Sequence, residues 1–173
     1  MKRSQLVTAM GVAAATVGGA TALRRFGRKP SPRDVVRSHY AAIQTRDWVR
    51  LKTLTSNNVE YRDPDVEVRG REEMLSRAQQ LESAFSDVSL QANIVGGNGH
   101  EAVAEWKYTG NHSAPMRLPD GTVIPPAGRR ISVKGMSLFQ VQDGVVTAEH
   151  TYWDNEALHS QLQAIGEKAA VEA

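Results

Sequence analysis

The sequence predicts an α+β fold in which a cone-shaped, curved antiparallel sheet packs against three helices and encloses a cavity. Three observations support this fold class. Apolar residues recur at helical spacing before Phe85, they alternate with polar residues after it, and turns rich in Gly, Asn and Asp separate the alternating segments. Helices against the concave side of such a sheet enclose a cone with one open end.

The composition is that of a single globular domain with an extension. The chain has 173 residues with 40% hydrophobic and 23% charged side chains, and it contains no cysteine. Disulfides, thiolate metal sites and cysteine nucleophiles are therefore excluded. We expect a signal-like extension and linker over residues 1–30, the cone domain over residues 31–165, and a disordered tail over residues 166–173.

The net charge of +2 is unevenly distributed along the chain. Residues 1–33 hold seven basic side chains and no acidic one, which leaves a net charge of −5 on the rest of the protein. An acidic domain binds phosphate groups poorly. We therefore expect no nucleic-acid partner.

Residues 6–23 are uncharged, follow Lys2 and Arg3, and end in a small-x-small pattern at residues 20–22. This pattern is typical of a secretory signal or a weak membrane anchor. Four basic residues follow at positions 24–29 and resist translocation. The sequence predicts an exported or membrane-anchored protein, and a cytoplasmic protein with a disordered tail is the alternative.

Three helices are expected in the first half of the domain. Ser31 is a plausible N-cap with Pro32 at the first helical position, for a helix that reaches about Thr45. Asp47 caps a short second helix, and residues 71–85 form a long third helix with an apolar face. The buried stripe of the first helix contains Val35, Val36, His39, Tyr40 and Ile43.

Strands are expected where apolar residues alternate or cluster between turn signals. The turn at residues 63–65 joins two short strands, glycines at residues 96–99 form a hairpin, and Asp143 with Gly144 forms a tight turn. Residues 115–128 contain several prolines, and we expect them to form a loop that overhangs another part of the domain. The expected strands span residues 59–63, 66–69, 88–94, 102–112, 131–142 and 145–153.

The last strand carries the side chains with the clearest potential for chemistry. Because side chains alternate across a strand, Val146, Ala148, His150, Tyr152 and Asp154 are expected to share one face. If that face lines a cavity, a carboxylate stands at its rim beside an imidazole and a phenol. If it faces water, the same residues carry no such meaning.

Several short segments together resemble the SnoaL-like polyketide cyclases, of the nuclear transport factor 2-like superfamily. They are YRDPDVEVRGREEM, GNHSAP, PPAGRR and DGVV followed by YWDNEALHSQL, in this order over about residues 33–163. The resemblance implies an α+β cone and an acid/base aspartate at the end of the last strand, at Asp154. It also matches His112 to a Gly-x-His signature, although Gln163 stands where the family usually has Gly.

Each candidate site residue also has a structural interpretation. Asp154 is a good N-cap for the final helix. His150 and His112 are candidate partners of an enolate oxygen but also plausible exposed histidines, and Tyr152 can donate a hydrogen bond or simply pack. The remaining candidates are ligand-binding residues that are otherwise core: Trp106, Tyr108, His39, Tyr40 and Met136.

The leading hypothesis is a cofactor-independent lyase or isomerase that acts on a small hydrophobic carbonyl compound. Asp154 would abstract a C–H proton, and His112, His150 or Tyr152 would hold the enolate oxygen. No metal-ligand cluster, phosphate loop or nucleophile elbow is present in the sequence, so no cofactor or metal is expected.

Two other functions and one assembly state follow from the same sequence. A non-catalytic ligand-binding or dimerisation module is the main alternative, because fold does not determine function. An epoxide hydrolase is the third candidate function and ranks last, because the expected long strands carry no Arg-x-Asp motif.

A homodimer is expected, because the outer face of an open sheet must be covered or polar.

Overall fold

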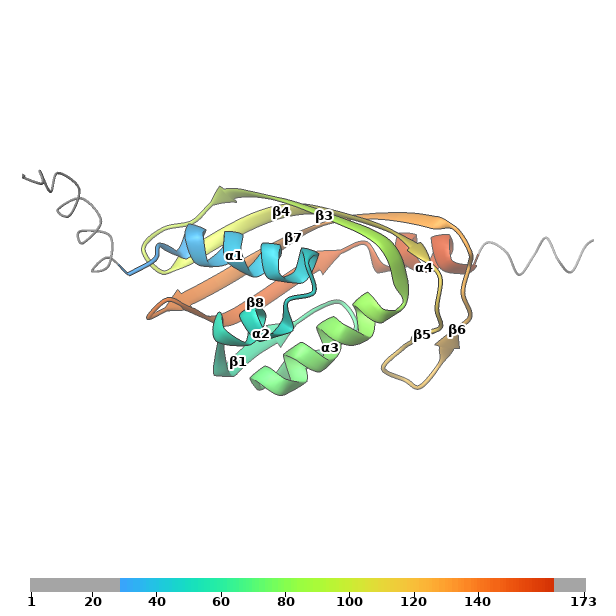
Figure 1. Cartoon of the computed structure of the whole chain (residues 1–173), viewed down its shortest axis with the longest axis horizontal. Coiled ribbons are helices and arrows are strands. Elements are labelled where there is room, and N and C mark those ends of the chain that lie inside the picture. The colour runs from blue at the N-terminus through green and yellow to red at the C-terminus, as the bar shows by residue number, and fades with distance from the viewer. Residues whose placement is uncertain (1–28, 164–173) are drawn as a thin grey trace, which may run out of the picture.

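The computed structural model describes residues 29–163 (Figure 1). Most of the predicted extension at residues 1–30 lies outside the described residues, which include only its last two positions. The predicted tail at residues 166–173 also lies outside them. Within the described range, no helix is long and apolar enough to cross a membrane. The elements are α1 (Pro32–Gln44), α2 (Trp48–Thr53), β1 (Thr55–Arg62), β2 (Glu67–Arg69), α3 (Arg71–Ser83), β3 (Phe85–Gly96), β4 (Glu101–His112), β5 (Met116–Arg117), β6 (Val123–Ile124), β7 (Arg130–Gln142), β8 (Val145–Trp153) and α4 (Asn155–Gln163).

A curved sheet with the strand order β2-β1-β8-β7-β4-β3 forms the body of the domain. This confirms the predicted α+β cone. The sheet is mixed, however, because β1 pairs parallel with β8 while the other neighbours pair antiparallel. The last strand, β8, runs beside the first strand, β1, in the same direction, so this parallel pair joins the two ends of the domain sequence. A separate hairpin, β5–β6, lies within the loop predicted between β4 and β7.

Helices α1 and α3 lie on the same side of the curved sheet, as Figure 1 shows. Helix α1 begins as predicted, because Ser31 and Asp34 form a reciprocal capping box. Helix α3 ends at Ser83 instead of Phe85, because Phe85 already pairs with His112 as the first residue of β3. The main core cluster joins α1 and α3 to the sheet through Val35, Val36, Tyr40, Leu54, Val59, Tyr61, Met74, Ala102, Ala104, Phe139, Val141 and Val146.

A bulge at Thr147 changes the side-chain alternation of β8. Val141 pairs with Val146 and Gln140 pairs with Ala148, so Thr147 is an extra residue with no partner on β7. An extra residue reverses the face on which the following side chains point. The predicted common face of β8 was therefore wrong beyond Thr147: the buried residues of this part are Glu149 and Thr151, while His150 and Tyr152 lie on the outer face.

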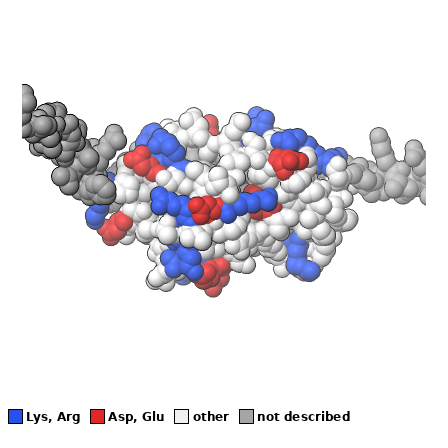
Figure 2. Space-filling model, viewed as in Figure 1, with Lys and Arg blue, Asp and Glu red and all other residues white. Residues whose placement is uncertain are grey.

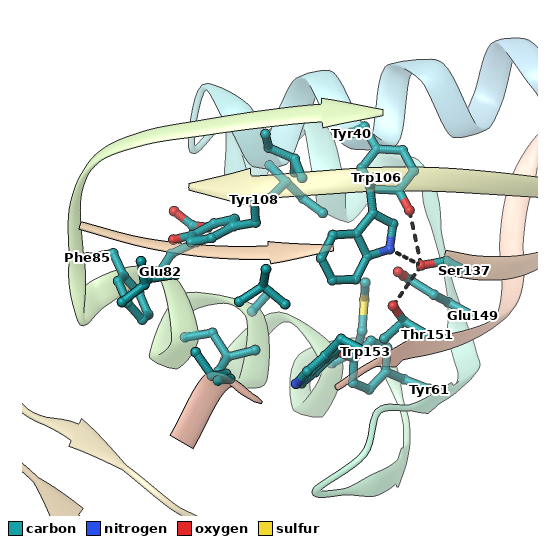
Figure 3. A pocket seen from close by; sticks show the side chains of 18 residues that line it. Tyr40, Tyr61, Glu82, Phe85, Trp106, Tyr108, Ser137, Glu149, Thr151 and Trp153 are labelled. Atoms are coloured by element: carbon teal, nitrogen blue, oxygen red, sulfur yellow. Dashed lines mark hydrogen bonds between the residues drawn. The ribbon is translucent and has the colours of Figure 1, made fainter. Parts of the chain in front are cut away.

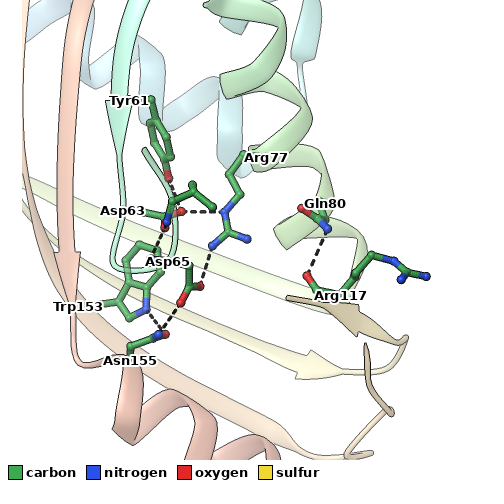
Figure 4. A network of polar contacts seen from close by, with 9 residues as sticks. Tyr61, Asp63, Asp65, Arg77, Gln80, Arg117, Trp153 and Asn155 are labelled. Atoms are coloured by element: carbon green, nitrogen blue, oxygen red, sulfur yellow. Dashed lines mark hydrogen bonds and ion pairs between the residues drawn. The ribbon is translucent and has the colours of Figure 1, made fainter. Parts of the chain in front are cut away.

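A buried ion network fastens the β1–β2 turn to α3 and to the start of α4 (Figure 4). The Arg77 Nε donates to Asp63 at 2.7 Å, and the side chain also donates to Asp65 at 2.8 Å. Asp65 in turn accepts from the Asn155 amide. Because Arg77 and Asp63 are both buried, removing either would leave an uncompensated charge. The predicted turn at residues 63–65 is confirmed, and it also has this anchoring role.

Acidic and basic side chains are interspersed on the face shown in Figure 2. Exposed ion pairs of the domain include Arg62 with Glu67 and Lys52 with Glu72. Such pairs contribute little to stability. The arrangement on this face differs from the single basic patch that is typical of nucleic-acid binding.

Gly135 makes room for the indole of Trp106 at the centre of the sheet. The two residues are paired across β7 and β4. A Cβ at position 135 would lie 2.2 Å from the Trp106 ring and 2.5 Å from the Tyr152 carbonyl oxygen. Any larger residue would therefore push against both an aromatic wall and the backbone.

We predict that Gly135→Ala lowers the free energy of unfolding by about 1–3 kcal/mol, because the added methyl overpacks this site. Gly99→Ala is the matched control, because a Cβ there would meet nothing within 4 Å. The control should change stability by less than about 0.5 kcal/mol. Urea denaturation of both variants measures the difference, and equal stabilities would contradict this account of Trp106.

Candidate functional site

A cavity of about 150 Å³ lies between the helices and the concave face of the sheet (Figure 3). Its walls are almost entirely apolar and aromatic, with a few polar groups at defined positions. An engineered cavity of about this size in another protein takes up benzene, whereas drug-sized ligands need about 300 Å³ or more. The lining residues are Tyr40, Ile43, Tyr61, Met74, Ala78, Leu81, Glu82, Phe85, Leu90, Trp106, Tyr108, Ile131, Val133, Ser137, Glu149, Thr151, Trp153 and Leu158.

Glu149 is a buried carboxylate in the wall of this cavity. The bulge at Thr147 turns it inward from β8, where its side chain is only 7% exposed. Its Oε2 lies 3.1 Å from Nε2 of the fully buried His39 on α1. The contact lacks the alignment of a hydrogen bond, and Oε2 has no other partner in the part of the chain that the structure describes. The Glu149 carboxylate therefore lies in the wall of an apolar cavity, next to an imidazole and within reach of a ligand.

Ser137 organises the hydroxyl groups beside Glu149. Its Oγ accepts from the Tyr40 hydroxyl at 3.0 Å and from the Trp106 indole nitrogen at 3.0 Å. It donates to Thr151 Oγ1 at 2.7 Å. A serine hydroxyl has one donor and two acceptor positions, so Ser137 is saturated. Thr151 accepts this bond and keeps its own hydrogen for a further acceptor.

The two phenols nearest Glu149 stay protonated. Burial raises the pKa of Tyr40, and the negative charge of Glu149 raises it further. Burial also raises the pKa of Tyr61, with contributions from Asp63 and Glu149. Both hydroxyls donate to protein acceptors, since Tyr40 bonds Ser137 and Tyr61 bonds Asp63. Thr151 is therefore the hydroxyl in this group that is best placed to donate to a ligand.

The structure brings some of the predicted ligand-binding residues together and separates others. Tyr40, Trp106 and Tyr108 line the cavity. His39 lies behind the lining, in contact with Glu149. Met136 is 39% exposed and lies on the outer face of β7, so the structure does not support its predicted role in the cavity.

Three of the predicted catalytic residues lie outside the cavity. Asp154 is exposed, and its Oδ1 accepts from the Ala157 amide at 2.8 Å. It therefore caps α4, as its structural interpretation expected. Tyr152 is 49% exposed on the outer face, and His150 Nε2 lies 3.4 Å from Glu60 across the same face. The bulge at Thr147 is the physical reason for these last two placements.

His112, the fourth predicted catalytic residue, is fully buried at the end of β4. Its Nδ1 accepts from the Ala127 amide at 3.0 Å, which holds the end of the loop between β4 and β7. Because Nδ1 accepts, the proton of the neutral ring lies on Nε2. Burial lowers the pKa of His112, and the Ala114 backbone partly opposes this effect. The side chain does not line the cavity, so its observed role is to fasten the loop.

The sequence interpretation missed the polar residues of the cavity wall, although two had visible signals. Ser137 interrupts an alternating series of otherwise apolar or glycine residues in β7. Glu82 lies at helical spacing from Met74 and Ala78, on the apolar face of α3. Glu149 had no comparable signal, because its inward direction depends on the bulge.

The described residues 29–163 contain no group of three His, Cys, Asp or Glu side chains that could hold a metal ion.

Residues 33–162 match the SnoaL-like polyketide cyclase family. The chain belongs to this family. No curated protein matches the sequence significantly. The predicted family and cone fold are thereby confirmed.

Solved structures with the same fold extend the comparison of this SnoaL-like protein. A SnoaL-like protein from Jannaschia sp. CCS1 is 19% identical with a TM-score of 0.68, covering 80% of this chain and 99% of its own. TsrD from Streptomyces laurentii is 27% identical with a TM-score of 0.64, covering 76% and 94%. IdmH from Streptomyces antibioticus is 22% identical with a TM-score of 0.64, covering 77% and 99%. These similarities establish the fold.

We predict that protonation of His112 destabilises this SnoaL-like domain in mild acid. The pKa of His112 is lowered in the folded state, so the unfolded chain binds more protons below the usual histidine pKa of about 6.5. Stability should therefore fall as the pH decreases from about 6.5 towards the lowered pKa. The control is His112→Asn, which retains an acceptor for the Ala127 amide but cannot titrate. Urea denaturation between pH 7 and 5 should show a steeper loss for the wild type, and parallel curves would contradict the prediction.

Proposed function

We propose that this protein is a cofactor-independent lyase or isomerase that acts on a small carbonyl compound, with Glu149 as the acid/base. The observation that carries the proposal is the buried carboxylate of Glu149 in the wall of an apolar cavity. Asp154 is exposed and already engaged as a helix cap, so it lacks the dry surroundings that favour proton transfer. The role first assigned to Asp154 therefore moves to Glu149.

The proposed reaction begins with transfer of a proton from carbon to the Glu149 carboxylate. The electron pair of the broken C–H bond moves onto the carbonyl oxygen and forms an enolate. Thr151 is two residues from Glu149 on the same face, and its free hydroxyl hydrogen can bond that oxygen. The resulting carboxylic acid then returns the proton to another carbon of the enolate, which completes an isomerisation.

A ring closure uses the same groups in a second way. The enolate carbon attacks another carbonyl carbon of the same molecule, a C–C bond forms, and Glu149 returns its proton to the new alkoxide oxygen. The aromatic walls hold the two reacting carbons near each other, which lowers the entropic cost of the attack. At about 150 Å³, the cavity favours a single-ring or short acyclic substrate over a multi-ring one.

We predict that Glu149→Gln lowers the rate of proton transfer by at least about a hundredfold, because the amide cannot act as the base. The probe is a β,γ-unsaturated cyclohexenone, whose isomerisation to the conjugated ketone is followed by ultraviolet absorbance. The matched control is Asp154→Asn, which keeps a good helix cap and should retain the rate within about twofold. Thermal unfolding verifies that both variants fold. A rate that survives in Glu149→Gln but collapses in Asp154→Asn would return the catalytic role to Asp154.

A non-catalytic binding module is the second candidate function, and one observation favours it. Asp154 has the structural role that this alternative expects. In that case the wild type would bind small ketones in the cavity without isomerising them or exchanging their α-protons with D₂O. Nuclear magnetic resonance of bound ketones in D₂O distinguishes the two functions, because catalysis requires deuterium incorporation that depends on Glu149.

We also infer a homodimer that forms through the outer face of β7 and β8. Leu138 and Tyr152 are 46% and 49% exposed there, beside the exposed Met136. Neighbouring exposed apolar groups on a sheet face are typical of an association surface. This inference is independent of the catalytic proposal.

We predict that Leu138→Lys converts the dimer into a monomer in light scattering coupled to size-exclusion chromatography, because it places a charge in the contact. Val49→Lys is the control, since Val49 is an apolar residue 78% exposed on α2, away from β7 and β8. The control should remain dimeric. A wild-type protein that is monomeric at tens of micromolar would contradict the inference.

A further inference from the structure

The cavity has a second polar end, formed by Glu82 of α3 and Tyr108 of β4. Figure 3 shows this pair on one side of the cavity and Glu149, Ser137 and Thr151 on the other. Tyr108 pairs with Val133, which is four residues from Ser137 along β7. The two ends are therefore about 13 Å apart at the backbone. Their side chains point into a shared apolar interior.

Glu82 is a buried carboxyl group that lies between Arg46 and Tyr108. Its side chain is 7% exposed, and its Oε2 lies 3.3 Å from Arg46 Nε. Arg46 also donates to the carbonyl oxygens of Glu82 and Phe85, so it belongs to the outer wall of the cavity. Burial raises the pKa of Glu82, while Arg46 and Tyr108 oppose this effect.

Tyr108 completes this end of the cavity. Its hydroxyl is buried beside the Glu82 carboxyl group, but among residues 29–163 it has no hydrogen-bond partner with good geometry. Burial and the nearby Glu82 both raise the pKa of Tyr108, so the phenol remains a donor. A buried donor without a well-aligned partner destabilises the fold, and a ligand atom that accepts its hydrogen bond removes that cost. This phenol differs in this respect from Tyr40 and Tyr61, whose hydroxyls are satisfied by protein.

The combination of a free donor and a carboxylate selects the chemistry of the ligand. A carbonyl oxygen can accept from Tyr108 but has nothing to donate to Glu82. An ammonium group can donate to Glu82 but cannot accept from Tyr108. A hydroxyl group does both at once.

We propose that Glu82 and Tyr108 bind a hydroxyl group of the ligand, at the end of the cavity opposite Glu149. The substrate class is then a hydroxylated ring ketone, with the carbonyl beside Glu149 and Thr151 and the hydroxyl across the ring. The orientation of the carbonyl rests on the proposed function. The hydroxyl site itself rests only on Glu82, Tyr108 and the cavity between the two ends.

The test compares the binding of three ring ketones that differ at one position. The ligands are para-hydroxyacetophenone, its methyl ether and acetophenone, and Trp106 and Trp153 in the cavity wall report their binding by fluorescence. In the wild type, the hydroxy compound should bind about tenfold more tightly than either analogue, because only its hydroxyl can both donate and accept. Tyr108→Phe and Glu82→Gln should reduce this advantage to less than about threefold.

Two further variants separate this proposal from the proposed function. Glu149→Gln should keep the preference for the hydroxy compound, because its change lies at the other end of the cavity. Tyr152→Phe, on the outer face, should match the wild type. Equal binding of the three ketones, no binding of the hydroxy compound up to millimolar concentration, or a preference that survives in Tyr108→Phe would overturn the hydroxyl site. Absence of turnover by the wild type would overturn only the proposed catalysis.

Discussion

One extra residue in β8 decides which side chains reach the cavity. Strand β8 must pair with β7 on one side and with β1 on the other, and its register changes at Thr147 against both neighbours. Because side chains alternate, this single bulge directs Glu149 inward and Tyr152 outward. The same strand thereby supplies a buried carboxylate to the cavity and an apolar group to the outer surface.

Hydrogen-bond saturation explains how the cavity can be both apolar and specific. Ser137 satisfies Tyr40 and Trp106, and the Asp63–Arg77 network satisfies Tyr61. These aromatic side chains therefore act as walls with no unpaired donors. Two polar positions then remain for a ligand, Thr151 beside Glu149 and Tyr108 beside Glu82. Because these two positions lie at opposite ends of the cavity, a ligand that bonds to both can bind in only one orientation.

The hydrogen-bond network around Arg77 links α3 and the β1–β2 turn to Trp153 in the cavity lining. Asp65 accepts from Asn155, which itself accepts from the indole nitrogen of Trp153 in the cavity lining. The β1–β2 turn, α3 and α4 are thus held in one arrangement about the cavity (Figure 4). Burial of the ion pairs makes that arrangement costly to change. The position of Trp153 therefore depends on the ion pair of Arg77 with Asp65, two residues that are far from Trp153 in sequence.

Sequence patterns predicted the fold better than they predicted the site. The cap at Ser31, the helical spacing of α1 and the glycine turn after β3 are local signals, and they led to the correct elements. The parallel pairing of β1 with β8 and the bulge at Thr147 depend on partners distant in sequence, so no local pattern revealed them. Asp154 shows the consequence, because its place before a helix identified both a cap and a family position without showing which way it pointed.

The inward direction of the residues after the bulge is the central claim, and thiol accessibility tests it most directly. The chain has no cysteine, so Thr151→Cys and Tyr152→Cys each introduce a single thiol. In the monomeric Leu138→Lys background, where the inferred contact does not cover Tyr152, the thiol at position 152 should react with a thiol reagent at nearly the rate measured in denaturant, and the thiol at position 151 should react at least about a hundredfold more slowly. The reverse order, or equal rates in two stably folded variants, would contradict the bulge and with it the placement of Glu149 in the cavity.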